Sequence, residues 1–594
     1  MCFDNKLTYP VDSEYLLRKK KKIKRELLKK EDFIEKKIAV LGGSTTSEII
    51  NILELFLLFN GIKPSFYESG FNLFYEDALF ANEKLDKFNP DIVYIHVTHK
   101  NIYHSTELIK DKYDVDNAIS NEIYKYSSIW KSLDKYNCDI IQNNFDFPLH
   151  RNLGNLDCYD ISGKTYFLNK LNQKIAEKAI KINNLHINDI NYLSSYIGIH
   201  NWFDNILWHK AKYAVSMESI PELSFNISKI INAIIGKNKK CLVLDLDNTC
   251  WGGVIGDDGL SGIEVGLETA TSEAFTYFQN YIRELKNRGI ILAVCSKNNF
   301  NNAKEGFSHP DTVLKFQDFS SFKANFDHKH YNIINIGNDI NIGLDSLVFI
   351  DDNPVERELV SLQLPTVVVP NVGSDVTNFI SHIDRNGYFE SVSLSSEDLN
   401  RHMYYEDNKK RINEEISFKS YDGFLQSLKM VADIGIFSKI YIDRITQLIN
   451  KTNQFNLTTK RYSLGETKMF MNSGKYISLY LKLSDKHGSS GLVSIIVGRI
   501  KGNECHVDLF LMSCRVLKRG VEFIIFDEYI KYCKKHNMNR VIGYYFKSAK
   551  NSIVSTLYKD LGFLMVNDDS KEKLVWILDV SKYVNKGKFI EVVL

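Results

Sequence analysis

The sequence predicts an α/β protein with three domains, and three observations lead to that fold class. At 594 residues the chain is long enough for about three domains. Between residues 36 and 400, short apolar runs alternate with helical segments, which is the pattern of parallel sheets covered by helices. After residue 400, three successive strands precede a helix, which predicts a smaller α+β domain.

The predicted boundaries divide the chain into four segments: a basic helical segment at 1–35, a first α/β domain at 36–235, a second at 236–400, and a linker helix with the third domain at 401–594. The basic run RKKKKIKRELLKK, residues 18–30, is the kind of pattern that also occurs in nucleic-acid or membrane-binding patches. Ile23, Leu27 and Leu28 are interspersed with its charges, so we expect a solvated helix instead.

The central domain places polar side chains directly after apolar strands. Three apolar runs, at 241–244, 290–294 and 347–350, lead into Asp245 and Asp247, Ser296 and Lys297, and Asp351 and Asp352. Lys329 lies in the polar stretch between the second and third runs. The carboxyl ends of parallel strands are where α/β folds place their chemistry. We therefore expect these side chains to gather around one pocket at the edge of a sheet.

This ordered set, D-x-D, then Ser, then Lys, then D-D, resembles the motifs of the haloacid dehalogenase (HAD) phosphotransferases. Four motifs in order make the resemblance specific, whereas a lone D-x-D-x-T would be weak. The intervals between them hold one predicted helix, residues 271–288, and leave no room for an inserted cap domain. A HAD core without a cap has an open site, which favours a protein or carrier-bound substrate.

Phosphoryl transfer depends mainly on positioning and charge neutralisation, which gives each residue a predicted role. Asp245 would attack phosphorus and form an aspartyl-phosphate, while Asp247 would act as general acid and base. Ser296 and Lys329 would hold the phosphoryl oxygens. Mg²⁺ is the expected cofactor because it prefers oxygen ligands, here Asp245, Asp247, Asp351 and Asp352. The sequence leaves open which of Asp351 and Asp352 contacts the metal. Further candidate substrate contacts are Asn248, Thr249, Lys297, Asn298, Arg515 and Gly520.

The chain also resembles the FkbH-like family, over roughly residues 36 to 594. The matching blocks include LVLDLDNTCWGGVIGDDG, CSKNNFNNAKEGFSHPD, LVFIDDNPVERELV and NKTNQFNLTTKRYS. The resemblance implies loading of a glyceryl group, from the small acyl phosphate 1,3-bisphosphoglycerate, onto the thiol of an acyl carrier protein. In better-known members this step supplies polyketide building blocks. One departure is Cys250, where the family usually has Leu.

The carrier protein is expected on a separate chain. The segment GLDSL, residues 343–347, resembles a carrier's phosphopantetheine-accepting motif, but its Ser346 leads straight into the strand at 347–350. An enzyme cysteine could relay the acyl group. Cys514 ranks first, because Arg515 and Lys518 nearby could lower the pKa of its thiol. Cys295 is the rival relay.

Both flanking domains resemble known folds with departures. The first resembles SGNH hydrolases, with Ser44 as nucleophile, Asn144 as oxyanion donor, and Asp204 and His209 at an unusual spacing for a base. A docking or substrate-shaping role is favoured over esterase activity. The third resembles acyl-CoA N-acetyltransferases (GNAT), whose R-x-x-G-x-G loop is kept here at Arg515 and Gly520 but has Lys518 for a glycine. The polar run at 450–461 could be a ligand wall or an ordinary turn-rich surface.

The amino-acid composition narrows the classes of protein to which this chain could belong. A net charge of +2 gives no argument for nucleic-acid binding, and no apolar run is long enough to span a bilayer. Nine cysteines without a C-x-x-C pair, and an N-terminus unlike a signal peptide, lead us to expect a cytoplasmic enzyme. Two alternatives stay open: a plain HAD phosphatase acting on a phosphorylated sugar or protein, and a carrier-docking scaffold without catalysis.

Overall fold

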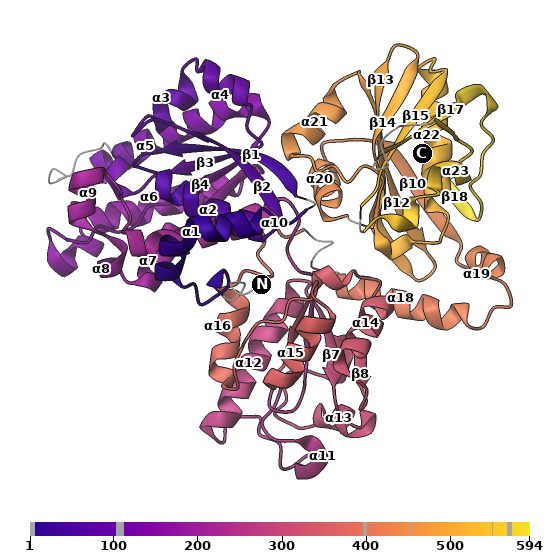
Figure 1. Cartoon of the computed structure of the whole chain (residues 1–594), viewed down its shortest axis with the longest axis horizontal. Coiled ribbons are helices and arrows are strands. Elements are labelled where there is room, and N and C mark those ends of the chain that lie inside the picture. The colour runs from indigo at the N-terminus through magenta and orange to yellow at the C-terminus, as the bar shows by residue number, and fades with distance from the viewer. Residues whose placement is uncertain are drawn as a thin grey trace. The chain divides into compact units, whose positions relative to one another are not determined.

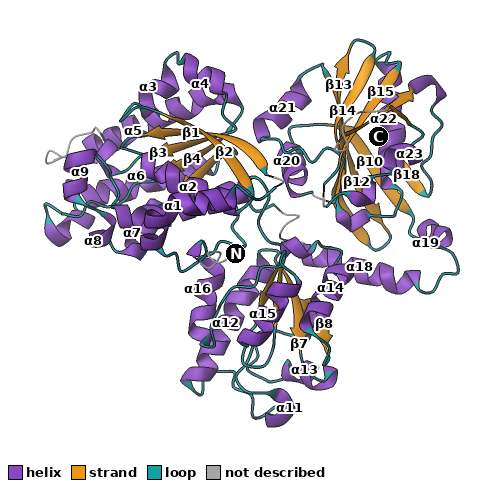
Figure 2. Cartoon of the chain, viewed as in Figure 1, coloured by secondary structure: helices purple, strands orange, loops and turns teal. Residues whose placement is uncertain are grey.

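The protein is described by a computed structural model over residues 6–31, 33–102, 112–395, 399, 401–452, 454–548, 550–566 and 573–593. These residues form two compact units. The first unit is Met1–Ile235 with Ser463–Glu466, and the second is Gly236–Tyr462 with Thr467–Leu594. Figure 1 traces the chain by residue number and Figure 2 separates its helices from its strands.

The first unit is built on a parallel five-stranded sheet in the order β2-β1-β3-β4-β5. The strands are β1 (Ile34–Gly42), β2 (Ile62–Glu68), β3 (Ile92–His96), β4 (Asp139–Asn143) and β5 (Leu185–Asn188). The helices are α1 (Ser13–Leu27), α2 (Ser47–Phe59), α3 (Phe74–Leu79), α4 (Glu83–Phe88), α5 (Lys112–Leu133), α6 (Lys164–Ala179), α7 (Ile190–Ile197), α8 (Ile199–Trp202), α9 (Asn205–Ala211) and α10 (Ile220–Ile234). The order reverses at β1, as in doubly wound folds.

Residues 18–27 of the basic run lie in helix α1, so the predicted helix is present, but one face of it is buried where a solvated helix was expected. Leu16, Ile23 and Leu27 are buried on one face of it, while Lys20 and Lys24 form ion pairs with glutamates of α2. The run is therefore a packed amphipathic helix of the first unit. Among the helices of the described residues, none is long and apolar enough to cross a bilayer.

The second unit begins with a parallel four-stranded sheet in the order β8-β7-β6-β9. Its strands are β6 (Cys241–Leu244), β7 (Ile291–Ser296), β8 (Phe319–Ala324) and β9 (Leu347–Ile350). Its helices are α11 (Ile255–Asp258), α12 (Ala270–Asn287), α13 (Phe300–Gly306), α14 (Lys329–Asp339), α15 (Pro354–Gln363) and α16 (Phe379–Asp384). This sheet carries the predicted catalytic residues.

Strand periodicity explains why both faces of this sheet are covered. Successive side chains of a strand point to opposite faces. Leu242 and Leu244 pack in one cluster with residues of α12 and α16, whereas Cys241 and Val243 pack in a second cluster with residues of α14 and α15. All four residues of β6 are buried, so β6 lies at the centre of a helix-sheet-helix sandwich.

The rest of the second unit is a mixed sheet in the order β16-β17-β15-β14-β13-β12-β10-β18, with β11 paired to β14. Its strands are β10 (Met430–Ile436), β11 (Phe455–Asn456), β12 (Tyr476–Asp485), β13 (Gly488–Lys501), β14 (Glu504–Met512), β15 (Arg540–Phe546), β16 (Leu564–Val566), β17 (Lys573–Asp579) and β18 (Ile590–Val593). The helices are α18 (Arg401–Glu415), α19 (Tyr421–Ser427), α20 (Ile442–Lys451), α21 (Leu464–Asn472), α22 (Val521–Lys535) and α23 (Leu557–Asp560). The predicted succession of three strands, a helix and a strand is confirmed.

Leu242 tests how strongly the β6 core supports the catalytic sheet. It is fully buried, so Leu242→Ala should lower the free energy of unfolding by about 2–5 kcal/mol through lost contacts and a residual cavity. The matched control is Leu362→Ala, because Leu362 is 71% exposed on α15 and should change stability by less than about 0.5 kcal/mol. Thermal unfolding of both variants checks this, and equal melting temperatures would contradict the assignment.

Candidate active site

The candidate active site lies where β6 and β9 end. The two strands pair in parallel with Leu244 opposite Ile350, and the Asp245 amide donates to the Ile350 carbonyl at 2.9 Å. Asp245 and Asp351 are therefore the next residue on each strand and leave the sheet at the same level. The sequence predicted this edge because each carboxylate follows a continuous apolar run.

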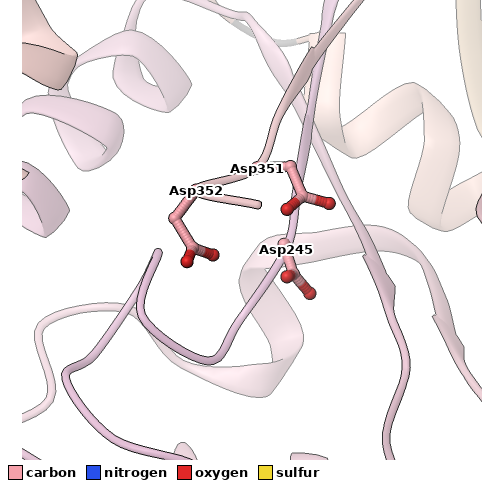
Figure 3. Close-up of side chains that lie close together, drawn as sticks. All are labelled: Asp245, Asp351 and Asp352. Atoms are coloured by element: carbon pink, nitrogen blue, oxygen red, sulfur yellow. The ribbon is translucent and has the colours of Figure 1, made fainter. Parts of the chain in front are cut away.

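Three carboxylates converge at this edge, as Figure 3 shows. Each of Asp245, Asp351 and Asp352 offers one carboxylate oxygen, and these three oxygens lie within 4.8 Å of one another. Burial and the neighbouring Asp245 carboxylate raise the pKa of Asp351 to about 6 and also raise the pKa of Asp352. Three acidic groups this close repel one another unless positive charge compensates them.

Lys329 supplies part of that positive charge. It is the first residue of α14, and its Nζ lies 2.8 Å from Asp245 Oδ2 and 2.6 Å from Asp351 Oδ2. Burial lowers the pKa of Lys329, but the two carboxylates outweigh burial and raise that pKa above its ordinary value. Lys329 is therefore a permanently charged bridge between two of the three carboxylates.

The remaining oxygens fit a hard divalent cation. Asp245 Oδ1 is buried and has no hydrogen-bond partner in the structure, although its carboxylate stands beside two others. A buried carboxylate oxygen without a partner is costly, and a cation would satisfy it. An all-oxygen donor set is what Mg²⁺ selects. The three carboxylates therefore form a site suited to this ion.

Asp247 does not belong to this cluster. Its Oδ1 accepts hydrogen bonds from the Trp251 indole at 3.0 Å and the Ile255 amide at 3.2 Å, and its Oδ2 accepts one from Asn298 Nδ2 at 2.7 Å. The sequence placed Asp247 among the metal ligands, whereas the described three-carboxylate group does not include its side chain. Burial raises the pKa of Asp247, which favours the protonated form that a general acid requires.

The other candidate contacts divide into site residues and loop supports. Ser296 is buried at the end of β7, next to β6. The Thr249 hydroxyl donates to Asp352 at 3.2 Å. Asn248 adopts a positive φ of 54° and accepts from the Gly253 amide, so its side chain closes the turn after β6. Lys297 pairs with Glu356 of α15 at 2.6 Å.

The sequence did not indicate the role of Arg357. Its guanidinium is buried and donates to the carbonyls of Asp351 and Asp352 at 2.7 and 2.6 Å. It therefore holds the loop that positions both carboxylates. The only signal in the sequence is its place in the helix that follows Asp352, where an arginine of α15 could equally have faced solvent.

Cys514 lies far from the carboxylates. It begins the short helix η9 (Cys514–Val516), and its carbonyl accepts a hydrogen bond from Asn341, just past the end of α14. Lys329 stands at the other end of α14, whose 11 residues make it about 16 Å long. The structure therefore does not bring Cys514 to Asp245. The rival Cys295 is fully buried, and burial raises its pKa well above the ordinary value.

Part of the polar run at 450–461 bonds to the neighbouring strands. β14 and β15 pair over only four residues, and the segment after β11 bridges them where they separate. The Leu457 amide donates to the Phe510 carbonyl, and the Phe546 amide donates to the Leu457 carbonyl. The fully buried Asn456 accepts from the amides of two following residues. Asn456 and Leu457 therefore brace the sheet, whereas Lys451, Thr452, Gln454 and Phe455 of the same run line a cavity of the second unit.

The loop that resembles the GNAT motif has positive φ angles at Lys518 and Gly520. Lys518 adopts a positive φ of 66° where the resembling motif has Gly, and Gly520 has a φ of 76° just before α22. The Lys518 carbonyl accepts from the Tyr421 hydroxyl at 3.0 Å. Arg515 stacks on the ring of Tyr404 at 4.7 Å. Both side-chain contacts come from α18 and α19, so these helices pack against the loop.

In the first unit, the residues of the predicted hydrolase-like site have the following described contacts. Ser44 is buried, whereas Asn144 donates to Asp189, Asp204 caps α9, and His209 is exposed. Ser44 Oγ has no hydrogen-bond partner among the described residues, and the neighbouring Thr45 bonds to Ala211 and Lys212 at the end of α9, the helix that carries His209.

Lys329→Met tests the charge balance of the site. Without the ammonium, Asp245 and Asp351 repel each other, so stability in EDTA should fall by about 3–5 kcal/mol. Added Mg²⁺ should raise the melting temperature more in the variant than in the wild type. The control is Lys297→Met, whose more exposed ion pair with Glu356 should be worth about 0–1 kcal/mol. Equal melting temperatures of the two variants in EDTA would refute the bridging role.

Comparisons with known proteins agree with this geometry. A family model described as FkbH, N-terminal domain, matches residues 37–232. The N-terminal part of protein BF1531 from Bacteroides fragilis, a crystal structure containing a phosphatase domain complexed with Mg, is 32% identical. The match covers 63% of this chain and 99% of that one, with a TM-score of 0.58.

Acetyltransferases match the chain more distantly. The ribosomal-protein-S18-alanine N-acetyltransferase from Escherichia coli is 11% identical over 25% of this chain and 94% of its own, with a TM-score of 0.21. No curated protein matches. The strand-end carboxylates and the similarity to BF1531 over nearly all of that chain lead to one conclusion: this chain belongs to the FkbH-like family and carries a HAD-type phosphatase domain.

Proposed function

We propose that this protein is a Mg²⁺-dependent phosphatase that removes phosphate from a small phosphorylated acyl donor and passes the acyl group to a carrier-protein thiol. The observation that carries the phosphatase step is the buried group of Asp245, Asp351 and Asp352, bridged by Lys329. The acyl-transfer step is supported by membership of the FkbH-like family.

Asp245 is the proposed nucleophile. Its carboxylate oxygen forms a bond to phosphorus while the bond from phosphorus to the ester oxygen breaks, which leaves an aspartyl-phosphate. Asp247 donates a proton to the departing oxygen and then takes one from the water that hydrolyses the aspartyl-phosphate. The hydrogen bonds from Trp251 and Asn298 hold Asp247 in place for both transfers.

Lys329 and Ser296 are the proposed phosphoryl-binding groups. The ammonium of Lys329 already stands between two carboxylates, so a phosphoryl oxygen would enter beside a fixed positive charge. Mg²⁺ held by Asp245, Asp351 and Asp352 would neutralise part of the charge on the phosphoryl oxygens. Arg357 keeps the last two carboxylates in position through their backbone carbonyls.

The open architecture supports a large partner. All residues from 245 to 351 are described, and between the motifs they form only α11 to α14, two short 3-10 turns and the core strands, with no inserted cap domain. A carrier protein on a separate chain would therefore have room to deliver its flexible arm. We take 1,3-bisphosphoglycerate as the donor, because its acyl phosphate accepts a thiolate at carbon and its phosphate ester suits Asp245.

A plain phosphatase is the second candidate, and the position of Cys514 favours it. A relay through Cys514 requires the acyl group to move between two sites at opposite ends of α14. A phosphatase acting on a sugar or protein phosphate needs only the carboxylate site.

Asp245→Asn decides whether this site performs the phosphate chemistry. The amide is a far poorer nucleophile, so phosphate release from 1,3-bisphosphoglycerate with Mg²⁺ should fall by at least about 10³-fold. The matched control, Asp311→Asn, changes a half-exposed carboxylate of the same domain and should retain activity. Mass spectrometry of a holo carrier protein in the same reaction separates the candidates. A glyceryl adduct supports transfer, phosphate release alone supports the plain phosphatase, and neither supports a scaffold.

Cys514→Ala separates the two steps. Because Cys514 lies at the far end of α14 from the carboxylates, the variant should release phosphate at the wild-type rate but fail to load the carrier. The control is Cys158→Ala, which removes an exposed thiol of the first unit. Carrier loading that survives in the Cys514 variant would exclude it as the relay.

A further inference from the structure

An ion pair spans the end of the central strand of the catalytic sheet. Lys297 is the residue directly after β7, and Glu356 lies in the first turn of α15, the helix that follows β9. Their charged atoms, Nζ and Oε1, are 2.6 Å apart. Because β6 lies between β7 and β9 in the sheet, a contact between these two side chains bridges across the end of β6, where Asp245 stands.

The electrostatics of a neighbouring thiol place Glu356 close to the catalytic charges. Cys295 is fully buried on β7 and packs on the face of the sheet that α14 and α15 cover. Burial raises the pKa of Cys295, and the charges that modify this pKa are those of Lys329, Asp245, Asp351 and Glu356. Glu356 therefore shares one side of the sheet with the charged groups of the candidate active site.

The two partners of the ion pair differ in burial. The Glu356 side chain is 11% exposed and its Oε2 has no hydrogen-bond partner among the described residues, whereas the Lys297 side chain is 37% exposed. A buried carboxylate is costly without a cation beside it, so Glu356 depends on the Lys297 ammonium. An ammonium has three N–H donors. One donates to Glu356, and this ammonium has no second acceptor among the residues that the structure describes.

This arrangement suits direct contact with an anion rather than long-range attraction. The pair is neutral as a whole, so it adds no net positive charge to the site. An acceptor on the exposed side of Lys297 nevertheless lies nearer the ammonium than the buried carboxylate, and a charge-assisted hydrogen bond is about twice as strong as a neutral one. The strand before Lys297 is adjacent to the strand before Asp245, about 4.8 Å away. An anionic group a few covalent bonds from a phosphoryl group at Asp245 could therefore reach Lys297.

We infer that Lys297, held in place by Glu356, is a specificity-determining residue that binds a second anionic group, a carboxylate or a second phosphate, of a small substrate whose phosphoryl group lies at Asp245. This role rests on the proposed phosphatase function and narrows its substrate class. It favours small phosphate esters with a further anion a few bonds from the phosphate, over phosphates of neutral sugars and over phosphorylated protein side chains.

Binding of two matched ligands tests the assignment. 3-Phosphoglycerate and glycerol 3-phosphate differ only in that the first has a carboxylate where the second has a hydroxymethyl group. Calorimetric titration of the full-length Asp245→Asn variant in Mg²⁺ measures both dissociation constants without turnover. The carboxylate should tighten binding by about 10- to 100-fold, the range for a hydrogen bond between charged groups.

Variants of the ion pair, made in the same background, make the result specific to Lys297. Lys297→Met should remove the preference for 3-phosphoglycerate and change the dissociation constant of glycerol 3-phosphate by no more than about twofold, whereas Lys297→Arg should retain a preference. Glu356→Gln should weaken the preference, because the ammonium loses the charge that fixes it. The matched control is Lys286→Met, which breaks an ion pair with Asp318 at the amino ends of β7 and β8 and should change neither constant.

If Lys297→Met does not fold, Lys297→Met/Glu356→Met replaces it, because that double change leaves no buried charge unpaired. A third ligand, glycerol 1,3-bisphosphate, identifies the anion. Tighter binding than that of 3-phosphoglycerate assigns the position to a second phosphate, and weaker binding assigns it to a carboxylate. Equal binding of 3-phosphoglycerate and glycerol 3-phosphate, or a preference that survives in either folded variant without the lysine, would overturn the inference.

Phosphate release by the wild-type chain is measured separately, so that the two proposals can fail independently. No release from any phosphate ester, or release that survives in Asp245→Asn, refutes the phosphatase function and leaves the dissociation constants to decide the role of Lys297. Equal kcat/KM values for 3-phosphoglycerate and glycerol 3-phosphate, in a chain whose release depends on Asp245, refute the specificity role alone.

Discussion

The catalytic sheet depends on one buried ammonium group. Lys329 stands between Asp245 and Asp351, within 2.8 Å of each, and all three side chains are almost completely removed from water. Carboxylates brought this close in a buried site would otherwise repel each other, and each unpaired charge would be costly to bury. The lysine allows the acidic group to be built into the fold, and Asp352 and the unpartnered oxygen of Asp245 leave the acidic excess that suits a cation.

Strand pairing converts this electrostatic arrangement into a fixed geometry. β6 and β9 are hydrogen-bonded neighbours, so Asp245 and Asp351 cannot shift relative to each other without breaking the sheet. α14 starts at Lys329 and packs Ile333 and Ile336 against the same sheet, which fixes the lysine backbone. Arg357 does the same for the loop after β9. The backbone positions of the charged site residues are therefore fixed by strand pairing, by helix packing and by the hydrogen bonds of Arg357.

Local pattern was enough to predict the parts of the protein that follow from strand runs. The apolar runs before Asp245 and Asp351 predicted both the strands and the shared edge, and Ser346 does lead directly into β9. Three-dimensional contacts decided the rest. The sequence does not reveal that the side chain of Asp247 turns towards Trp251, or that Cys514 meets Asn341 far from the carboxylates. The run at 450–461 could be a ligand wall or a turn-rich surface, because only the fold shows that Asn456 accepts hydrogen bonds from the backbone amides of Thr458 and Thr459.

The main-chain hydrogen bonds of Leu457 limit where a ligand could enter between strands of the mixed sheet. Its main chain hydrogen-bonds to β14 on one side and to the end of β15 on the other. It therefore links the two strands at the place where they diverge. A ligand that entered between the two strands there would have to break these hydrogen bonds, at a cost of roughly 0.5–1.5 kcal/mol for each bond lost. The gap between the two strands is therefore closed at this point by the chain's own backbone.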